Sequence, residues 1–118
     1  MPARIVVVLN DPELADATVS ALTADGYDAL AVHDSMAALT LLEQAEDIEL
    51  LVASTYFGPQ KPTGAALALM TRISRPGLKA IFTGNPELAA LLEDIGHVIS
   101  GPVSPSKMVN TARLALSG

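Results

Sequence analysis

Short aliphatic runs alternate with helix-forming segments along this chain, and this alternation restricts the fold more than any other feature of the sequence. Residues 5–9 are aliphatic throughout, which is typical of a strand buried on both faces of a parallel sheet. The Asp-Pro-Glu sequence at 11–13 then supplies an N-cap, a first helical residue and a first-turn acid. A helix is therefore predicted from this point to about Asp25, and Gly26 is predicted to end it.

The rest of the chain repeats this strand–helix unit. Further strands are predicted at residues 27–32, 49–54, 78–83 and 97–100. Further helices are predicted from the cap at 33–35 to about 45, over 64–74, after the Asn-Pro-Glu sequence at 85–87 up to 96, and from 104–105 to about 116. Strands that alternate with helices imply one doubly wound α/β domain of the (βα)5 type, with a parallel sheet and helices on both faces.

The helices carry expectations for burial. Met36 and Leu42 are predicted to face the core from the second helix. The helix over 64–74 is apolar almost all round, so we expect it to be deeply buried. Met70 and Met108, like Met36, lie at helical core spacing and are expected to fill gaps in the core.

Length, charge and composition exclude several classes of protein. A chain of 118 residues is one domain's worth, so we expect residues 1–118 to form a single domain, with no effector domain in this chain. The net charge of −6 argues against nucleic acid as a partner, because phosphate binding needs Lys and Arg. The apolar runs are far shorter than the ~20 residues of a membrane span, and no signal-peptide pattern is present. We therefore expect a cytoplasmic protein with no membrane contact. Without cysteine, disulfides and thiolate metal sites are excluded.

In their order and spacing, five stretches of the sequence resemble a response-regulator receiver domain over nearly the whole chain. They are RIVVVLNDPEL, DGYDALAVHDSMAAL, ELLVAS with the later PTG, KAIFTGNPEL, and GHVISGPVSPSKM. The resemblance implies a flavodoxin-like sheet with the strand order 2-1-3-4-5. It also implies a place in two-component signal transduction or a phosphorelay. Receiver domains accept a phosphoryl group from a histidine kinase on an Asp at the end of the third strand. An acidic pair after the first strand holds Mg²⁺ with it.

Most of the family's functional positions carry other residues here, which implies a degenerate or pseudo-receiver. The acceptor position falls on Ser54, and no Asp or Glu occurs between Glu49 and Glu87. The family's Lys before the Pro that follows the fifth strand is replaced by glycine. Carried over by position, the degenerate acceptor pocket comprises Leu9, Asn10, Asp11, Ser54, Thr83 and Gly101. Of these positions, Thr83 alone matches the family. The Pro after Gly101 makes a cis peptide bond plausible there.

The metal-binding position of the family is also changed. The acidic pair falls on Leu9 and Asn10, or on Asn10 and Asp11 if one gap is allowed. At most one carboxylate remains, whereas Mg²⁺ prefers a cluster of hard oxygen ligands, usually carboxylates. We therefore expect weak or absent Mg²⁺ binding, no other cofactor, no metal site and no aspartyl phosphorylation. A simpler role for Asp11 is the N-cap of the first helix. Ser54 can likewise be a strand-end hydroxyl that bonds to neighbouring backbone, or a pseudo-acceptor that mimics one fixed signalling state.

The partner surface is predicted from the resemblance and from two aromatic residues. Receiver domains bind partners and dimerise through the fourth helix, fifth strand and fifth helix, which makes Leu88, Val98 and Met108 candidate contacts here. Tyr56 and Phe57 lie together in a Gly/Pro-rich loop. They either fold back over the helix at 64–74 or form exposed contacts for a partner.

Three functions are compatible with these features. The first is an adaptor or dimer module that is not phosphorylated and binds a kinase, a regulator or a second copy of itself. The second is a flavodoxin-like module that binds a small ligand at the strand ends, although no glycine-rich phosphate cradle is present. The third is an enzyme with Ser54 as nucleophile. It lacks a base and the G-x-S-x-G elbow, so we expect no enzymatic activity.

Overall fold

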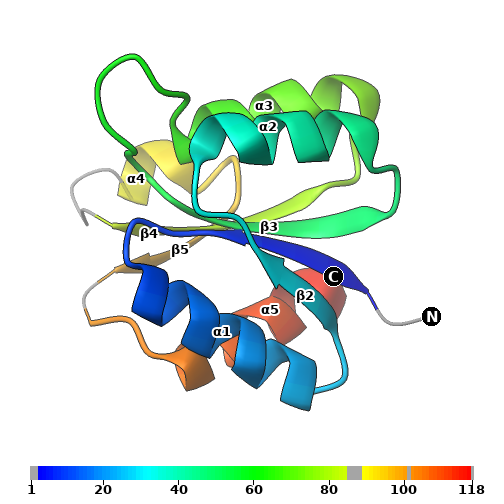
Figure 1. The fold of residues 1–118 in the computed structure, drawn as a ribbon, viewed down its shortest axis with the longest axis vertical. Coiled ribbons are helices and arrows are strands. Elements are labelled where there is room, and N and C mark those ends of the chain that lie inside the picture. The colour runs from blue at the N-terminus through cyan, green and yellow to red at the C-terminus, as the bar shows by residue number, and fades with distance from the viewer. Residues whose placement is uncertain (1–2, 85–88, 101, 118) are drawn as a thin grey trace.

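Five parallel strands form one sheet in the order β2-β1-β3-β4-β5 (Figure 1). The computed structural model describes residues 3–84, 89–100 and 102–117. The strands are β1 (Arg4–Val8), β2 (Asp28–Ala31), β3 (Ile48–Ser54), β4 (Lys79–Gly84) and β5 (His97–Ser100). The predicted parallel sheet and its strand order are confirmed, and each strand lies within one or two residues of its expected bounds.

Helices cover both faces of the sheet. They are α1 (Pro12–Ala24), α2 (Ser35–Gln44), α3 (Gly64–Ser74), α4 (Ala89–Leu92) and α5 (Pro105–Ser117). In Figure 1, α1 and α5 lie on one face, and α2, α3 and α4 lie on the other. The predicted fourth helix is only four residues long in the described part of the chain, and its expected cap at 85–87 lies outside the described residues. No helix among the described residues is both long and apolar enough to cross a membrane.

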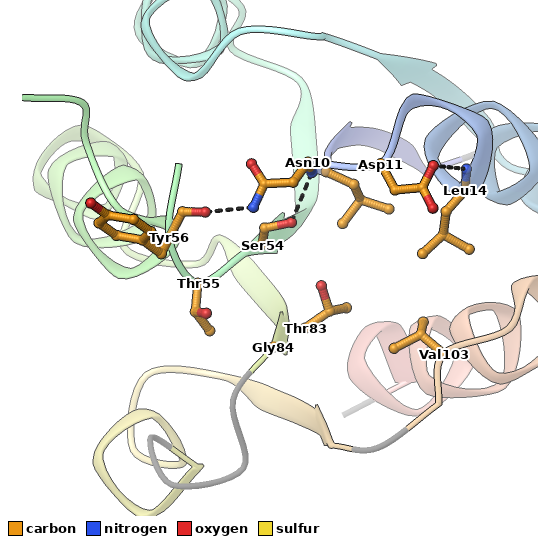
Figure 2. Close-up of a pocket in the computed structure, with 10 residues that line it drawn as sticks. Asn10, Asp11, Leu14, Ser54, Thr55, Tyr56, Thr83, Gly84 and Val103 are labelled. Atoms are coloured by element: carbon orange, nitrogen blue, oxygen red, sulfur yellow. Dashed lines mark hydrogen bonds between the residues drawn. The ribbon is translucent and has the colours of Figure 1, made fainter. Parts of the chain in front are cut away.

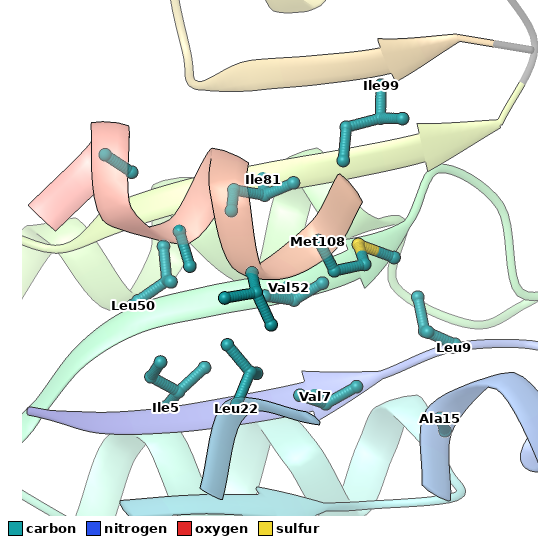
Figure 3. Packing of buried hydrophobic residues seen from close by; sticks show 13 residues of the cluster. Ile5, Val7, Leu9, Ala15, Leu22, Leu50, Val52, Ile81, Ile99 and Met108 are labelled. Carbon is teal, nitrogen blue, oxygen red and sulfur yellow. The ribbon is translucent and has the colours of Figure 1, made fainter. Parts of the chain in front are cut away.

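The central strands are buried on both faces, which explains their continuous apolar sequence. Successive side chains of a strand point to opposite faces of the sheet. Ile5 and Val7 of β1 therefore enter the core beneath α1 and α5, whose deepest residues include Leu22 and Met108 (Figure 3). Their neighbours Val6 and Val8 enter the second core, beneath α2 and α3, together with Leu42, Leu67 and Phe82.

The expected burial of α3 is wrong. Only one side of α3 packs on the sheet, where Leu67 and Ala68 are buried. Leu69 and Met70 are half-exposed, and Ile73 is 84% exposed. Met36 of α2 is half-exposed as well, so of the three methionines expected in the core only Met108 is buried. A helix that packs on one face of a sheet is buried only on the side that faces the sheet, even when its outer side is apolar.

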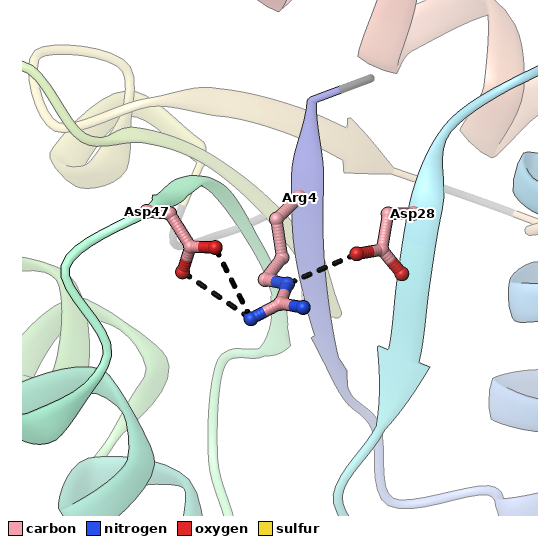
Figure 4. Close-up of polar contacts among 3 residues, drawn as sticks. All are labelled: Arg4, Asp28 and Asp47. Carbon is pink, nitrogen blue, oxygen red and sulfur yellow. Dashed lines mark hydrogen bonds and ion pairs between the residues drawn. The ribbon is translucent and has the colours of Figure 1, made fainter. Parts of the chain in front are cut away.

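Two arginine side chains connect neighbouring elements at the edge of the sheet where the strands begin. Arg4 of β1 forms ion pairs with Asp28 of β2 at 3.0 Å and with Asp47, just before β3, at 3.2 Å (Figure 4). The hydrogen bond to Asp28 and the charge of Asp47 raise the pKa of the Arg4 guanidinium. Arg75, which follows α3, donates to the carbonyl oxygens of Leu42 and Glu43 at the end of α2. These contacts join neighbouring elements at this edge.

A matched pair of glycine substitutions tests the packing of α3 on the sheet. Gly64→Ala is expected to lower the free energy of unfolding by about 1–3 kcal/mol, a usual effect of overpacking. The added Cβ would lie 2.3 Å from the carbonyl oxygen of Ser54 and 3.2 Å from the Phe82 ring. Gly77→Ala is the control, because no atom lies within 4 Å of its added Cβ. Urea unfolding measures both variants, and equal stabilities would contradict this packing.

Candidate functional site

An open cavity of about 340 Å³ lies at the carboxyl ends of β1, β3 and β4 (Figure 2). In open α/β sheets this edge is where ligands usually bind. We call this cavity the mouth. The residues that line it are Leu9, Asn10, Asp11, Leu14, Ser54, Thr55, Tyr56, Thr83, Gly84 and Val103.

Asn10 joins the end of β1 to the end of β3 through two hydrogen bonds. Its backbone amide donates to Ser54 Oγ at 3.0 Å. Its side-chain Nδ2 donates to the carbonyl oxygen of Tyr56 at 2.6 Å (Figure 2). The Ser54 hydroxyl therefore bonds to neighbouring backbone, which is the simpler of the two roles predicted for it. Backbone groups just past the end of a strand have no partner in the sheet. These two bonds provide partners for the amide of Asn10 and the carbonyl oxygen of Tyr56.

Asp11 is the N-cap of α1. Its Oδ1 accepts hydrogen bonds from the amides of Glu13 and Leu14, at 3.0 and 3.2 Å. The structure thereby confirms the capping role predicted from the Asp-Pro-Glu sequence. Because this oxygen satisfies two otherwise unpaired helix amides, the one carboxylate among the described residues that line the mouth already has a structural function.

The ends of β3 and β4 approach each other closely. Ser54 and Thr83 are partners in the parallel register, and both side chains are buried. The amide of Thr55 donates to the carbonyl oxygen of Thr83 at 3.0 Å. Gly84 has a φ of +149°, and a Cβ at this position would lie 2.3 Å from Thr55 Oγ1. A glycine is therefore needed where β4 leaves the mouth.

Among the described residues, the lining of the mouth lacks the cluster of carboxylates that Mg²⁺ usually prefers. Hydroxyl and amide groups surround one capping carboxylate, whereas Mg²⁺ is usually held by carboxylates together with water or phosphate. Among the described residues, no group of three His, Asp or Glu side chains is close enough to share a metal ion. The one side chain in the described lining of the mouth that could act as a base is Asp11, and its Oδ1 caps α1. His33 lies 3.9 Å from Asp16, on the exposed surface.

The structure brings most of the predicted pocket residues together. Those that line the mouth are Leu9, Asn10, Asp11, Ser54 and Thr83. Gly101, and with it the plausible cis bond, lies outside the described residues. The sequence did not indicate Leu14, Tyr56, Gly84 or Val103 as part of this pocket. Leu14 lies one helical turn after Asp11 and could have been placed from that spacing. Tyr56 reaches the mouth through the path of its loop, for which the sequence offers no comparable signal.

The predicted partner contacts differ in their exposure. Tyr56 is 58% exposed at the rim of the mouth, whereas Phe57 packs against the core beneath α2 and α3. Phe57 therefore folds back as one alternative predicts, whereas Tyr56 is exposed and stays a predicted partner contact. Val98 of β5 is partly buried against the same core. Met108 is fully buried, which corrects its assignment as a contact, since a side chain without exposed surface cannot touch a partner. Leu88 lies outside the described residues.

Comparison with known proteins identifies the fold. No family model matches the sequence, and no curated protein matches it. A response-regulator receiver domain protein (CheY-like) from Methanospirillum hungatei JF-1 has a TM-score of 0.82 at 22% identity, over 99% of this chain and 95% of that chain. The receiver domain of NtrX from Brucella abortus has a TM-score of 0.81 at 21% identity, over 96% of this chain and 98% of that chain.

A response-regulator receiver protein from Pseudomonas putida has a TM-score of 0.79 at 19% identity, over 97% of this chain and 98% of that chain. Longer NtrX chains from Brucella abortus also match, and this chain spans 27% of their length. At these identities the likeness establishes a shared fold, the receiver-type α/β fold.

Substitutions of Asp11 separate capping from metal binding. Asp11→Ala is expected to lower the free energy of unfolding by about 0.5–2 kcal/mol, because two helix amides lose their acceptor. Asp11→Asn is expected to retain most of the stability, since Asn caps helices about as well as Asp. Urea unfolding with and without Mg²⁺ measures both. If Mg²⁺ stabilised the wild type, and both variants abolished that effect equally, Asp11 would be a metal ligand instead.

Proposed function

We propose that this chain is a degenerate receiver domain that acts in two-component-type signal transduction through protein contacts, without accepting a phosphoryl group. The observation that carries the proposal is the donor set of the mouth. Ser54 ends β3, and the described residues that line the mouth include one carboxylate, Asp11, which caps α1. The likeness of the fold to receiver domains supports the signalling role.

The absence of phosphoryl transfer follows from the chemistry of these groups. A serine hydroxyl is a weak nucleophile unless a base removes its proton. In the described part of the mouth the one candidate base is the Asp11 carboxylate, which is engaged in capping α1. A phosphoryl group that is transferred also needs its charge neutralised by cations such as Mg²⁺, Lys or Arg. The described lining of the mouth contains no Lys or Arg either. We propose on these grounds that the chain is not an enzyme.

The edge formed by α4, β5 and α5 is the proposed contact surface for a kinase, a regulator or a second copy of the chain. Two large apolar side chains are exposed there: Leu91 of α4 is 73% exposed, and Leu114 of α5 is 66% exposed. Removal of such apolar side chains from water by a partner lowers the free energy and so favours binding. Leu91 and Leu114 take the place of Met108 as candidate contacts.

A second candidate function is the binding of a small polar ligand in the mouth. The volume of about 340 Å³ lies within the range of ligand sites. Hydroxyl groups of Ser54, Thr55 and Thr83 could orient such a ligand. A thermal-shift screen discriminates the two functions, because a ligand that binds the folded chain raises its melting temperature.

The phosphorylation state tests the main proposal directly. Wild-type protein incubated with acetyl phosphate and Mg²⁺ is expected to keep its mass, measured on the intact chain. The double variant Asn10→Asp/Ser54→Asp is the positive control, since it adds two carboxylates beside Asp11. Addition of one phosphoryl group to the wild type would refute the proposal.

Surface substitutions test the contact edge. The pair Leu91→Ser and Leu114→Ser is expected to abolish concentration-dependent self-association, measured by light scattering. Both side chains are exposed, so the free energy of unfolding should change by less than about 0.5 kcal/mol. Ile73→Ser on α3 is the matched control, because Ile73 is also an exposed apolar residue but lies on another surface. Loss of association in the control alone would move the interface to α3.

A further inference from the structure

We infer that the Asn10 side chain is a hydrogen-bonded latch that stands where a cation would otherwise bridge β1 to the loop at residues 55–63. This inference rests on the proposed function, because it explains how a receiver-type mouth keeps its shape without Mg²⁺. The observation behind it is the bond from Asn10 Nδ2 to the carbonyl oxygen of Tyr56, at 2.6 Å. That bond joins residues separated by 46 positions in the sequence.

The direction of this bond follows from the atoms at its two ends. A carbonyl oxygen can only accept, so the group that faces it at this distance must be a donor. The amide nitrogen of Asn10 satisfies this requirement, whereas its oxygen at the same place would repel the carbonyl. A carboxylate at position 10 would also bring two oxygens together. A cation between them would then be needed to hold the loop, and the Asn10 N–H makes that cation unnecessary.

Asn10 acts together with its own backbone. The amide of Asn10 holds Ser54 Oγ at 3.0 Å, while the side chain holds Tyr56 two residues further along. One residue therefore fixes the last residue of β3 and the first turn of the loop. Figure 2 shows both bonds on the same side of the mouth, with the Tyr56 ring beyond them. The latch thus sets the position from which Tyr56 is presented at the rim.

Other contacts hold the loop at its far end. Lys61 Nζ lies 3.3 Å from Asp34 Oδ1, and the bonds from the Ala37 amide and from Lys61 keep the pKa of Asp34 below its usual value. The amide of Gly64 donates to the carbonyl oxygen of Thr55 at 3.4 Å, where α3 begins. At the other end of the loop, next to β3, the hydrogen bond of the Asn10 side chain connects the end of β1 to Tyr56. Asn10 is therefore a positioning residue for Tyr56.

Amide hydrogen exchange measures the latch. Asn10→Asp is nearly isosteric and removes the donor. Asn110→Asp is the matched control, because it makes the same change of charge on the exposed surface of α5. The reporters are the amides of Thr55 and Gly64, which are hydrogen-bonded at the start of the loop and at its end, where α3 begins. Exchange is followed by NMR in EDTA and in excess Mg²⁺.

The expected result has three parts. In EDTA, both reporter amides of Asn10→Asp exchange roughly two- to tenfold faster than in the wild type, as expected for the loss of one hydrogen bond. Mg²⁺ slows them again in this variant, because it can bridge the new carboxylate and the carbonyl oxygen of Tyr56. Wild type and Asn110→Asp exchange at the same rates in both conditions. Asn10→Ala, which has neither donor nor carboxylate, exchanges faster in both.

Unchanged exchange in Asn10→Asp would refute the latch, and acceleration that Mg²⁺ does not reverse would refute its equivalence to a cation. Slower exchange of the reporter amides of the wild type in Mg²⁺ would also refute the equivalence of the latch to a cation. These outcomes are separable from a failure of the proposed function. Phosphoryl transfer to the wild-type chain would refute that function and would leave the exchange rates of the variants in EDTA unaffected.

Discussion

Burial of β1 between two strands and two layers of helices is the constraint on which the rest of the structure depends. Its side chains fill both cores, so the strand cannot shift without disturbing α1 and α5 on one face and α2 and α3 on the other. A shift of one residue would exchange the two sets of side chains. The packing of β1 therefore sets the position of Asn10 relative to Ser54, in addition to the polar contacts of the mouth.

A mouth built from hydroxyl and amide groups differs electrostatically from one built from carboxylates. Two unit charges 4 Å apart interact by about 4 kcal/mol at an effective dielectric constant of about 20. Several carboxylates gathered at one sheet edge would therefore repel each other strongly unless a cation neutralised them. Here Asn10 and Ser54 are neutral, and Asp11 accepts hydrogen bonds from two helix amides. The edge is stable in the arrangement that its own hydrogen bonds impose.

The parts of this structure that depend on local sequence could be predicted. The strands were located because continuous aliphatic runs are required of strands buried on both faces, and Asp11 was recognised as a cap because capping involves only its immediate neighbours. The exposure of Ile73 was not foreseen, since an apolar residue on an outer helix face looks the same in sequence as one in the core. Met108 was assigned to a contact surface by family position, although its core spacing pointed to burial.

The Asn10–Tyr56 bond lies beyond such reasoning for a different reason. It depends on the path of the loop, in which Gly58 and Gln60 both adopt positive φ angles. The path of such a loop is a tertiary property, and residue types alone leave it open. The pocket residues could therefore be gathered from the order of the strands, whereas the bonds among them required coordinates.

The contact between Arg75 and the end of α2 has a mechanical consequence. The last carbonyl groups of a helix have no partner within it, and here a guanidinium from the chain after α3 occupies two of them. The two helices are thereby tied at one end, while Lys61 and Asp34 tie the segments before them at the other. With restraints at both ends, α2 and α3 are expected to move as one rigid unit over the sheet. A displacement of the loop at residues 55–63 would then shift both helices, and their exposed apolar residues would move together relative to β5.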